Sequence, residues 1–313
     1  MMLLVTGTTG FIGSAVVRRL LDHGISVCGL VRDLKKARAL FANVEQEQNL
    51  TLLQGTLEEL PKEELAQHHI DACLHTAWIT TPGGYLDSPL NEDFLRWSKA
   101  LGDWIVDAGI SYVMGLGTCA EYGPSSEALV ESKSIIAPAS PYAKAKVALH
   151  QHWQAQFEAA GVGFCWGRVF YPYGPGEPLA KLCAYLLRRL HAGAPIELRT
   201  PHSAKDYIHI DDFTRAVGHL IHLRAQGTVN LGSGEAVTVA HLAHEAAVTS
   251  GCELDLVRVA AEPIDDPNPL VLADIGRLRE SGWEPSVSLC EGLQGELSYL
   301  RNIGAIPAAS VNH

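Results

Sequence analysis

Tyr142 and Lys146 lie four positions apart in the stretch PYAKAK, and their types suggest proton-transfer chemistry. Ser140 and Pro141 come just before Tyr142 and are typical of a helix start, because serine caps the first turn and proline suits the first helical position. Residues four apart share one helix face, and an ammonium near a phenol favours the phenolate and lowers the pKa of the tyrosine. Such a phenol can act as an acid or base near neutral pH, although a solvated amphipathic helix has the same spacing.

A glycine-rich stretch, TGTTGFIGS, covers residues 6–14 and follows the first apolar run. Gly7, Gly10 and Gly13 suit a tight turn from a strand into a helix, where backbone N–H groups and the helix dipole favour a pyrophosphate. At the beginning of a β-α-β series, this pattern favours dinucleotide binding over a simple turn.

The second apolar run ends at Arg32, where an NAD site usually places an acidic residue that binds the adenosine ribose. An arginine at this position can instead pair with a 2'-phosphate. The sequence therefore favours NADP as the cofactor. NAD stays as the alternative, in which Arg32 is a surface residue beside Asp33.

A regular alternation of strands and helices must position these residues. The expected strands are the apolar runs MLLVT, SVCGLV, LTLLQ, IDACLHTA, SYVMGLG and VGFCWGRVF. The expected helices cover residues 11–23, 33–41, 61–68, 88–109 and 141–160. This alternation predicts an α/β fold, a Rossmann-type doubly wound parallel sheet with helices on both faces.

After about residue 170 the alternation gives way to Pro/Gly-rich turns, a helix near 178–192 and short strands. This change predicts a dinucleotide-binding domain followed by a smaller C-terminal substrate-binding lobe. The expected ranges are 1–170 for the first domain with returning segments near 207–232, then 171–206 and 233–306 for the lobe, and 307–313 for a tail.

Composition argues against several classes of partner and site. The 313 residues contain 24 Lys and Arg and 35 Asp and Glu, and a net charge of -11 disfavours nucleic acid or an anionic membrane as the main partner. Seven scattered cysteines favour reduced thiols and a cytoplasmic location. The fourteen histidines form no convergent ligand set, so we expect no metal site.

Five ordered motifs make the chain similar to a known family. TGTTGFIG resembles its glycine signature, LHTAW its strand-four motif, YAKAK its Tyr-x-x-x-Lys pair, and YPYGPGE and KDYIHIDD two later blocks. Over nearly all of its length, the chain resembles the extended short-chain dehydrogenase/reductases, the branch with nucleotide-sugar epimerases, dehydratases and ketoreductases. The resemblance implies an NAD(P)-dependent oxidoreductase whose partner is a small-molecule substrate, a nucleotide sugar.

The same resemblance implies roles for individual residues. Tyr142 would be the general acid/base, Lys146 would stabilise its phenolate and bind the nicotinamide ribose, and Thr118 would orient the reacting oxygen. The implied cofactor-binding residues are Gly7, Thr9, Gly10, Phe11, Ile12, Gly13, Arg32, Thr56, Leu57, Thr76, Ala77, Trp78, Tyr142 and Lys146. The implied substrate-binding residues are Thr80, Thr118, Cys119, Tyr171 and Lys205.

The neighbours of Thr118 indicate which reaction to expect. Dehydratases of the family typically have Asp-Glu directly after this threonine, whereas this chain has Cys119 and Ala120. The fucose-synthase type of 3,5-epimerase uses a cysteine two positions after the threonine and a histidine after the Tyr-Gly-Pro turn, where this chain has Ala120 and Gly176. We therefore expect a ketoreductase that reduces a 4-keto group, with a 4-epimerase as the alternative.

Three departures from the family weaken the nucleotide-sugar assignment. Tyr171 replaces an asparagine of many relatives, Lys205 replaces an arginine, and a further phosphate-binding arginine is missing near Pro263. Guanidinium groups hold diphosphates better than ammonium groups do. A reductase of a non-nucleotide ketone or aldehyde and a non-catalytic NADP-sensing protein therefore stay as alternatives.

The resemblance also implies a homodimer. In many relatives, the helices expected here over 88–109 and 141–160 form a four-helix interface between two copies. The apolar residues on them permit such an interface, but they would serve the core of one chain equally well.

Overall fold

In the computed structural model, helix α5 (Pro141–Ala160) begins where the sequence predicts. The Ser140 hydroxyl accepts a hydrogen bond from the Ala143 backbone N–H at 3.2 Å, and Pro141 occupies the first helical turn. The helix ends at Gly161, whose φ of 69° is a left-handed conformation that favours glycine. These local features fix the first turn of α5, which carries Tyr142.

The structure describes residues 1–44, 47–81 and 83–307, so residues 308–313 of the expected tail lie outside the described part of the chain. Within this part, the chain forms two compact units. Unit 1 comprises Met1–Gly123, Ser134–Val169 and Thr214–Asn230, and unit 2 comprises Pro124–Lys133, Phe170–Phe213 and the residues from Leu231 onward.

Unit 1 is built on a seven-stranded sheet in the order β10-β6-β5-β4-β1-β2-β3. Its strands are β1 (Met2–Thr6), β2 (Ser26–Val31), β3 (Leu50–Gln54), β4 (Ala72–His75), β5 (Tyr112–Thr118), β6 (Gly163–Val169) and β10 (Gly227–Leu231). The first six strands pair in parallel throughout. The expected Rossmann-type doubly wound sheet is therefore confirmed.

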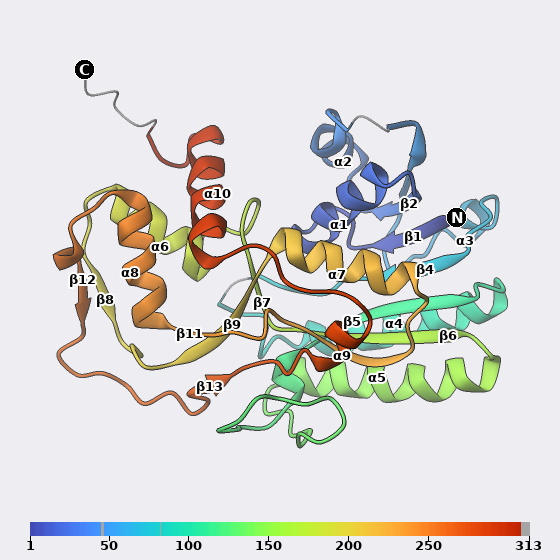
Figure 1. Ribbon diagram of the computed structural model, residues 1–313. Coiled ribbons are helices and arrows are strands. Elements are labelled where there is room, and N and C mark those ends of the chain that lie inside the picture. The colour runs from blue at the N-terminus through green and yellow to red at the C-terminus, as the bar shows by residue number, and fades with distance from the viewer. Residues whose placement is uncertain (45–46, 82, 308–313) are drawn as a thin grey trace. The chain divides into compact units, whose positions relative to one another are not determined.

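Helices cover both faces of this sheet (Figure 1). They are α1 (Phe11–Asp22), α2 (Leu34–Phe41), the short α3 (Lys62–Leu65), α4 (Leu90–Asp107), α5 and α7 (Ile210–His222). Helices α4 and α5 lie on one face, and α1, α2 and α7 lie on the other. The apolar strands thus become the core of the unit, where Leu4, Val113 and Trp166 are fully buried.

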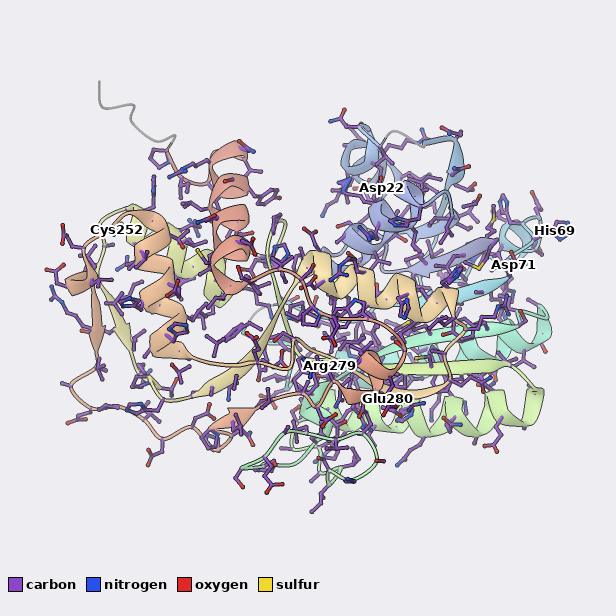
Figure 2. The ribbon with its side chains drawn as sticks, in the orientation of Figure 1. Asp22, His69, Asp71, Cys252, Arg279 and Glu280 are labelled. Atoms are coloured by element: carbon purple, nitrogen blue, oxygen red, sulfur yellow. The ribbon has the colours of Figure 1, made fainter. Side chains whose placement is uncertain are left out.

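The order of the strands reverses between β1 and β4, and this is the point where open α/β sheets bind ligands beyond the carboxyl ends of the strands. The glycine-rich stretch follows β1, LHTAW continues past β4, and Thr118 ends β5. The fold therefore gathers the predicted motifs at one edge. At the opposite edge, Asp71, labelled in Figure 2, accepts a hydrogen bond from the Met2 backbone N–H at 2.7 Å.

Unit 2 combines short strands with four helices, three of which pack on one another. Strand β9 (Ala204–His209) pairs with β7 (Tyr171–Tyr173), β11 (Ala236–Thr238) and β13 (Leu270–Val271), and β8 (Ile196–Leu198) pairs with β12 (Val257–Val259). The helices are α6 (Leu182–His191), α8 (Val239–Ser250), α9 (Gly276–Glu280) and α10 (Leu289–Asn302). Buried leucines of α6, α8 and α10 form the core of this unit.

Two helices differ from their expected ranges. Helix α6 starts at Leu182, because the residues after Pro178 form a turn in which the Lys181 N–H bonds the Pro178 carbonyl at 2.8 Å. Helix α3 is one short turn rather than an eight-residue helix. Within the described residues, no helix is both long enough and apolar enough to span a membrane.

Candidate active site

The turn after β1 requires glycine at two positions. Gly7 has a φ of 72°, and a Cβ atom there would lie 2.6 Å from the Thr76 hydroxyl. A Cβ atom at Gly13 would lie 2.1 Å from the Gly7 carbonyl oxygen. Both distances are too short for real contacts, so these glycines let β1, α1 and the end of β4 approach one another closely.

Gly10 differs from these two glycines because its φ of -75° suits any residue and a Cβ atom would meet a single neighbour. A Cβ atom at Gly10 would approach only the Gly7 carbonyl oxygen, at 3.3 Å. Gly10 is the N-cap of α1, where no side chain bonds the first N–H groups, and the first turn contains no acidic residue. An uncapped helix start without negative charge fits a phosphate group, so the residues present fit the pyrophosphate of a dinucleotide.

The other expected cofactor residues lie at the same edge of the sheet, after β1, β2, β3 and β4. The Thr76 hydroxyl donates to the Thr6 carbonyl at 2.8 Å, which ties β4 to β1 at the point where the strand order reverses. Arg32 is exposed at the end of β2. Thr56 accepts a hydrogen bond from the Glu59 N–H at 2.8 Å and so closes its own turn, while Leu57 beside it is buried. Thr9, Phe11, Ile12 and Ala77 are partly exposed around the glycine turn and the end of β4.

Thr118 and Tyr142 meet at the carboxyl end of β5. Thr118 is the last residue of β5, Tyr142 lies in the first turn of α5, and the Thr118 hydroxyl is near enough to lower the pKa of Tyr142. Tyr142 is half-buried, and its ring packs edge-to-face on Tyr85 with centroids 5.0 Å apart. Two neighbouring hydroxyl groups at the ligand edge can together contact one carbonyl oxygen.

The pKa of Tyr142 differs from the expectation that a neighbouring ammonium lowers it. Burial and the nearby Tyr85 raise the pKa of Tyr142 well above its usual range, and the hydrogen bond from Thr118 only partly opposes them. The physical reason is that the Lys146 ammonium is bound elsewhere and burial disfavours the phenolate. Tyr142 is therefore a protonated phenol, which suits a proton donor.

Lys146 is buried one helical turn after Tyr142. Its ammonium donates to the Leu116 carbonyl oxygen at 2.7 Å and lies 3.9 Å from the centroid of the Trp78 ring. Burial lowers the pKa of Lys146 to about 7, although the negative charge of Glu121 opposes this shift. The lysine can therefore change its charge near neutral pH.

The sequence alone did not identify Glu121 as part of the site. Its carboxylate is fully buried and accepts hydrogen bonds from the Thr118 backbone N–H at 2.9 Å and from Arg168 Nε at 2.8 Å. Arg168 was the available indication, because a single arginine in the apolar run VGFCWGRVF needs a buried partner of opposite charge.

Trp78 was expected to bind the cofactor, and the structure places it against Lys146. The indole N–H donates to Asn91 Oδ1 at 2.8 Å, and Asn91 in turn donates to the carbonyl oxygens of Tyr85 and Ser88. The ring is 9% exposed and is thus fixed in orientation by α4. Neither Asn91 nor Tyr85 belonged to the expected site.

The expected substrate residues are divided between the two units. In unit 1, Cys119 is buried and Thr80 is exposed. In unit 2, Tyr171 packs on Tyr207 with ring centroids 5.8 Å apart. Lys205 forms an ion pair with Asp266 at 2.9 Å and donates to the Asn268 carbonyl oxygen, so its ammonium is already paired rather than available to replace a phosphate-binding arginine.

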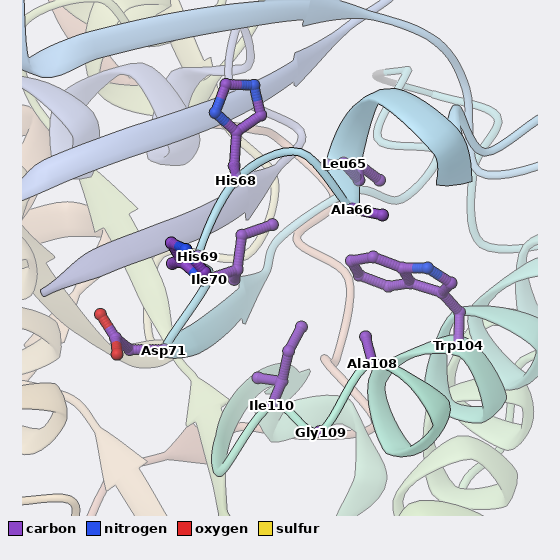
Figure 3. A pocket seen from close by; sticks show the side chains of 10 residues that line it. All are labelled: Leu65, Ala66, His68, His69, Ile70, Asp71, Trp104, Ala108, Gly109 and Ile110. Atoms are coloured by element: carbon purple, nitrogen blue, oxygen red, sulfur yellow. The ribbon is translucent and has the colours of Figure 1, made fainter.

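A cavity of about 360 Å³ lies away from these residues (Figure 3). Trp104, Ile70 and Ile110 line it, together with the residues that precede β4 and β5. It therefore opens at the amino-terminal edge of the sheet, whereas Thr118 and Tyr142 lie at the carboxyl edge. The cavity takes no part in the candidate active site.

Residues 3–232 match the NAD dependent epimerase/dehydratase family. The chain belongs to this family. It is therefore an NAD(P)-dependent enzyme, and the resemblance inferred from the five motifs is confirmed. A UDP-glucose 4-epimerase from Azospirillum brasilense is 28% identical, with 96% of this chain and 92% of the relative covered. A probable GDP-L-fucose synthase 1 from Oryza sativa subsp. japonica is 26% identical, with 92% and 88% covered.

Solved structures of similar proteins agree with the family. The dTDP-glucose 4,6-dehydratase DesIV from Streptomyces venezuelae, solved with NAD bound, is 27% identical and gives a TM-score of 0.82 over 98% of this chain and 99% of that chain. A UDP-glucuronic acid 4-epimerase from Bacillus cereus, in complex with UDP-glucuronic acid and NAD, is 20% identical with a TM-score of 0.82 over 97% and 100%. At this identity, the second structure supports the fold alone.

Proposed function

We propose that this member of the epimerase/dehydratase family is an NADP-dependent reductase of a keto group, at C4, of a nucleotide-activated sugar. The observation that carries the proposal is the meeting of Thr118, at the carboxyl end of β5, with Tyr142, in the first turn of α5, beside the buried Lys146. The GDP-L-fucose synthase, the UDP-glucose 4-epimerase and the dTDP-glucose 4,6-dehydratase described above are all named for sugars linked to a nucleoside diphosphate, which supports the substrate class.

The surroundings of Thr118 favour reduction over dehydration. Cys119 and Ala120 supply no carboxylate for removing a proton from an adjacent carbon. The nearest carboxylate along the chain, Glu121, is bound by Arg168 and the Thr118 N–H inside the protein. A carboxylate held in this way is not available to a substrate.

The mechanism follows from the positions of three side chains. Thr118 would donate a hydrogen bond to the carbonyl oxygen and so orient it, while Tyr142, kept protonated by burial, would deliver its proton to that oxygen. Lys146 would hold positive charge next to the proton donor. NADPH, when bound through Gly7, Gly10 and Lys146, supplies the hydride.

Arg32 is the reason for preferring NADP. It occupies the end of β2, it is exposed, and its guanidinium can pair with a 2'-phosphate. The family description and the solved neighbours name NAD, so NAD is the direct competitor in any test.

A 4-epimerase is the second candidate, because a relative that is 28% identical over nearly the whole chain is named a UDP-glucose 4-epimerase. The two reactions differ in what happens to the cofactor. A reductase consumes NADPH once per product, whereas an epimerase re-reduces its intermediate and consumes none.

The experiment measures NADPH and NADH oxidation with 4-keto sugars linked to UDP, GDP and dTDP, and in parallel the conversion of UDP-hexoses to their 4-epimers. Stoichiometric NADPH oxidation with a keto sugar supports the reductase. Epimer formation without net oxidation of the cofactor supports the second candidate. The absence of both activities with every nucleotide sugar would contradict both candidates.

Three further expectations remain predictions. Unit 2 is proposed to be the substrate-binding lobe and to contribute some of the substrate-binding residues. The protein is proposed to form a homodimer through α4 and α5, and its location is proposed to be cytoplasmic. Analytical ultracentrifugation tests the dimer directly, since a monomer at micromolar concentration contradicts it.

A further inference from the structure

Glu121, in the turn that follows Thr118, forms an ion pair with Arg168. The proposed reaction does not require this ion pair. Strand β5 ends at Thr118, and the short 3-10 turn η2 (Cys119–Glu121) follows. Glu121 ends this turn with its side chain fully buried. A buried carboxylate is costly unless it is paired, so its position next to the candidate active site calls for a functional reason.

The Glu121 carboxylate fixes the backbone of Thr118. Oε1 accepts the Thr118 N–H at 2.9 Å and the Trp166 indole N–H at 3.0 Å. In return, the Thr118 hydroxyl accepts the Ala120 N–H at 3.2 Å. These reciprocal bonds hold the turn in one conformation and thereby set where the Thr118 hydroxyl lies.

Arg168 holds the other end of the carboxylate. Its Nε donates to Glu121 Oε2 at 2.8 Å, and its Nη1 donates to the Tyr122 hydroxyl, also at 2.8 Å. The Tyr122 hydroxyl donates onward to Asn230 at 2.8 Å. The pair is thus part of a network that joins η2, β6 and β10.

Glu121 also acts on both candidate catalytic groups through its charge. Burial lowers the pKa of Lys146, and Glu121 raises it. Burial raises the pKa of Tyr142, and Glu121 adds to that effect. In both cases a negative charge nearby favours the form that carries the proton.

The other titratable and charged groups around Glu121 and Lys146 do not supply this charge. They are Tyr142 and His150 on α5, Arg168 on β6, His75 on β4, and Cys119 and Tyr122 in the turn. The rings of His150 and Trp166 stack with centroids 5.0 Å apart, and burial and Arg168 lower the pKa of His150 to about 4. Burial and Lys146 likewise lower the pKa of His75. Both histidines are therefore neutral near pH 7.

We propose that Glu121 is a positioning residue that anchors Thr118 and keeps the Lys146 ammonium charged beside Tyr142. This role rests on the proposed function, in which Lys146 holds positive charge next to the proton donor. The ion pair with Arg168 stabilises the Glu121 charge inside the protein, and that charge biases the site toward the direction of carbonyl reduction.

The test separates the effect of the Glu121 charge from the effect of its side-chain length. E121Q removes the charge and keeps the length, whereas E121D keeps the charge and loses the reach to the Thr118 N–H. E121Q/R168M removes both charges, so that no buried guanidinium is left unpaired. E158Q is the control, because Glu158 is an exposed glutamate near the far end of α5.

The first readout is the titration of Lys146, followed by NMR in protein with ¹³C-labelled lysine, without cofactor or substrate. We expect the midpoint to fall by about one pH unit in E121Q and in E121Q/R168M, and to stay near the wild-type value in E121D and E158Q. An unchanged midpoint in E121Q would overturn the proposal. A wild-type Lys146 midpoint in E121Q/R168M would also overturn the proposal. The shift in E121Q would then come from the unpaired Arg168 and not from the lost charge of Glu121.

The second readout is the pH dependence of reduction. We expect the alkaline limb of kcat to move to lower pH in E121Q, and kcat to fall in E121D between about tenfold and about 100-fold with little change in KM. Equal kcat values and equal pH profiles in E121D, E121Q and the wild type would contradict the role. The NMR titration needs no turnover, so a failure of the proposed reaction can be told apart from a failure of this inference.

Discussion

The Lys146 ammonium lies over the face of the Trp78 ring, 3.9 Å from its centroid. It also donates to the Leu116 carbonyl oxygen at 2.7 Å. An aromatic face attracts a cation through its quadrupole, and this attraction is strongest where water is excluded. Trp78 therefore helps a buried lysine to keep its charge.

Replacing Trp78 tests this contact. Phenylalanine keeps an aromatic face and leucine has a similar volume without one, so W78F and W78L differ mainly in the interaction with the cation. We expect Lys146 to titrate at a lower pH in W78L than in W78F, by up to about one pH unit, because a cation–π contact is worth about 0.5–2 kcal/mol. NMR of labelled lysine measures both midpoints, and a midpoint in W78L at or above that of W78F would contradict the contact.

Gly10 and Gly13 should respond differently to alanine. G13A places a methyl group 2.1 Å from the Gly7 carbonyl oxygen, so we expect it to lower the free energy of unfolding by at least about 1–3 kcal/mol. G10A has a compatible φ of -75° and one tight contact, 3.3 Å from the Gly7 carbonyl oxygen, so the fold should keep its stability to within about 1 kcal/mol. Denaturant unfolding measures both values.

The same G10A protein should bind the dinucleotide poorly, because its methyl group would occupy the space next to the uncapped start of α1. We expect the Kd for NADPH to rise about tenfold or more, equal to ~1.4 kcal/mol. A stable G10A protein with the wild-type Kd would place the pyrophosphate elsewhere.

Arg32 should decide between the two nicotinamide cofactors. R32A should weaken NADPH binding by about 1.5–3 kcal/mol and leave NADH binding unchanged, because only NADPH carries the 2'-phosphate. Isothermal titration of both cofactors measures the ratio of their Kd values. R38A is the control, since Arg38 is an exposed arginine in the last turn of α2. Equal losses for both cofactors in R32A would contradict the NADP assignment.

The predictable part of this structure depended on local chemistry. Gly7 and Gly13 indicated a turn with two positions that only glycine fits, and Ser140 with Pro141 indicated the start of α5. The apolar runs indicated which segments form the parallel strands, because buried strands have a continuous apolar pattern. These features depend on a few neighbours in sequence, which is why they could be inferred without coordinates.

The remaining features depend on contacts between distant segments. Glu121 follows a strand as a polar residue would in any loop, and only the fold brings it to Arg168, 47 positions away. Lys205 stands in the place of a phosphate-binding arginine of the relatives, but its ammonium forms an ion pair with Asp266, 61 positions away. The raised pKa of Tyr142 likewise follows from burial, which the Tyr-x-x-x-Lys spacing does not indicate.

Unit 2 contains a buried carboxylate that should make stability depend on pH. Both oxygens of Glu296 are buried without a hydrogen-bond partner, and burial raises its pKa to about 7. Burial also raises the pKa of the nearby Glu177 to about 8, with a further contribution from Glu296. Because the folded state holds these protons more tightly than the unfolded state, stability is greatest below the unfolded pKa and falls as pH rises toward 8.

E296Q should remove part of this decline. We expect the gain in stability of the variant over the wild type to be larger at pH 8.5 than at pH 5.5, by about 1–3 kcal/mol. Thermal or denaturant unfolding at the two pH values measures the difference. E280Q is the control, because Glu280, labelled in Figure 2, is exposed on α9 of the same unit. A gain in E296Q that is equal at both pH values would show that Glu296 is not titrating in this range.

The most direct test of the central claim compares Y142F with the wild type in single-turnover reduction of a 4-keto sugar nucleotide at saturating NADPH. The phenylalanine ring keeps the packing on Tyr85 but has no proton to donate. We predict that the Kd for NADPH stays within about threefold and that the rate constant falls by about 100-fold to 10,000-fold. A Y142F rate constant close to that of the wild type would contradict the claim that Tyr142 delivers the proton.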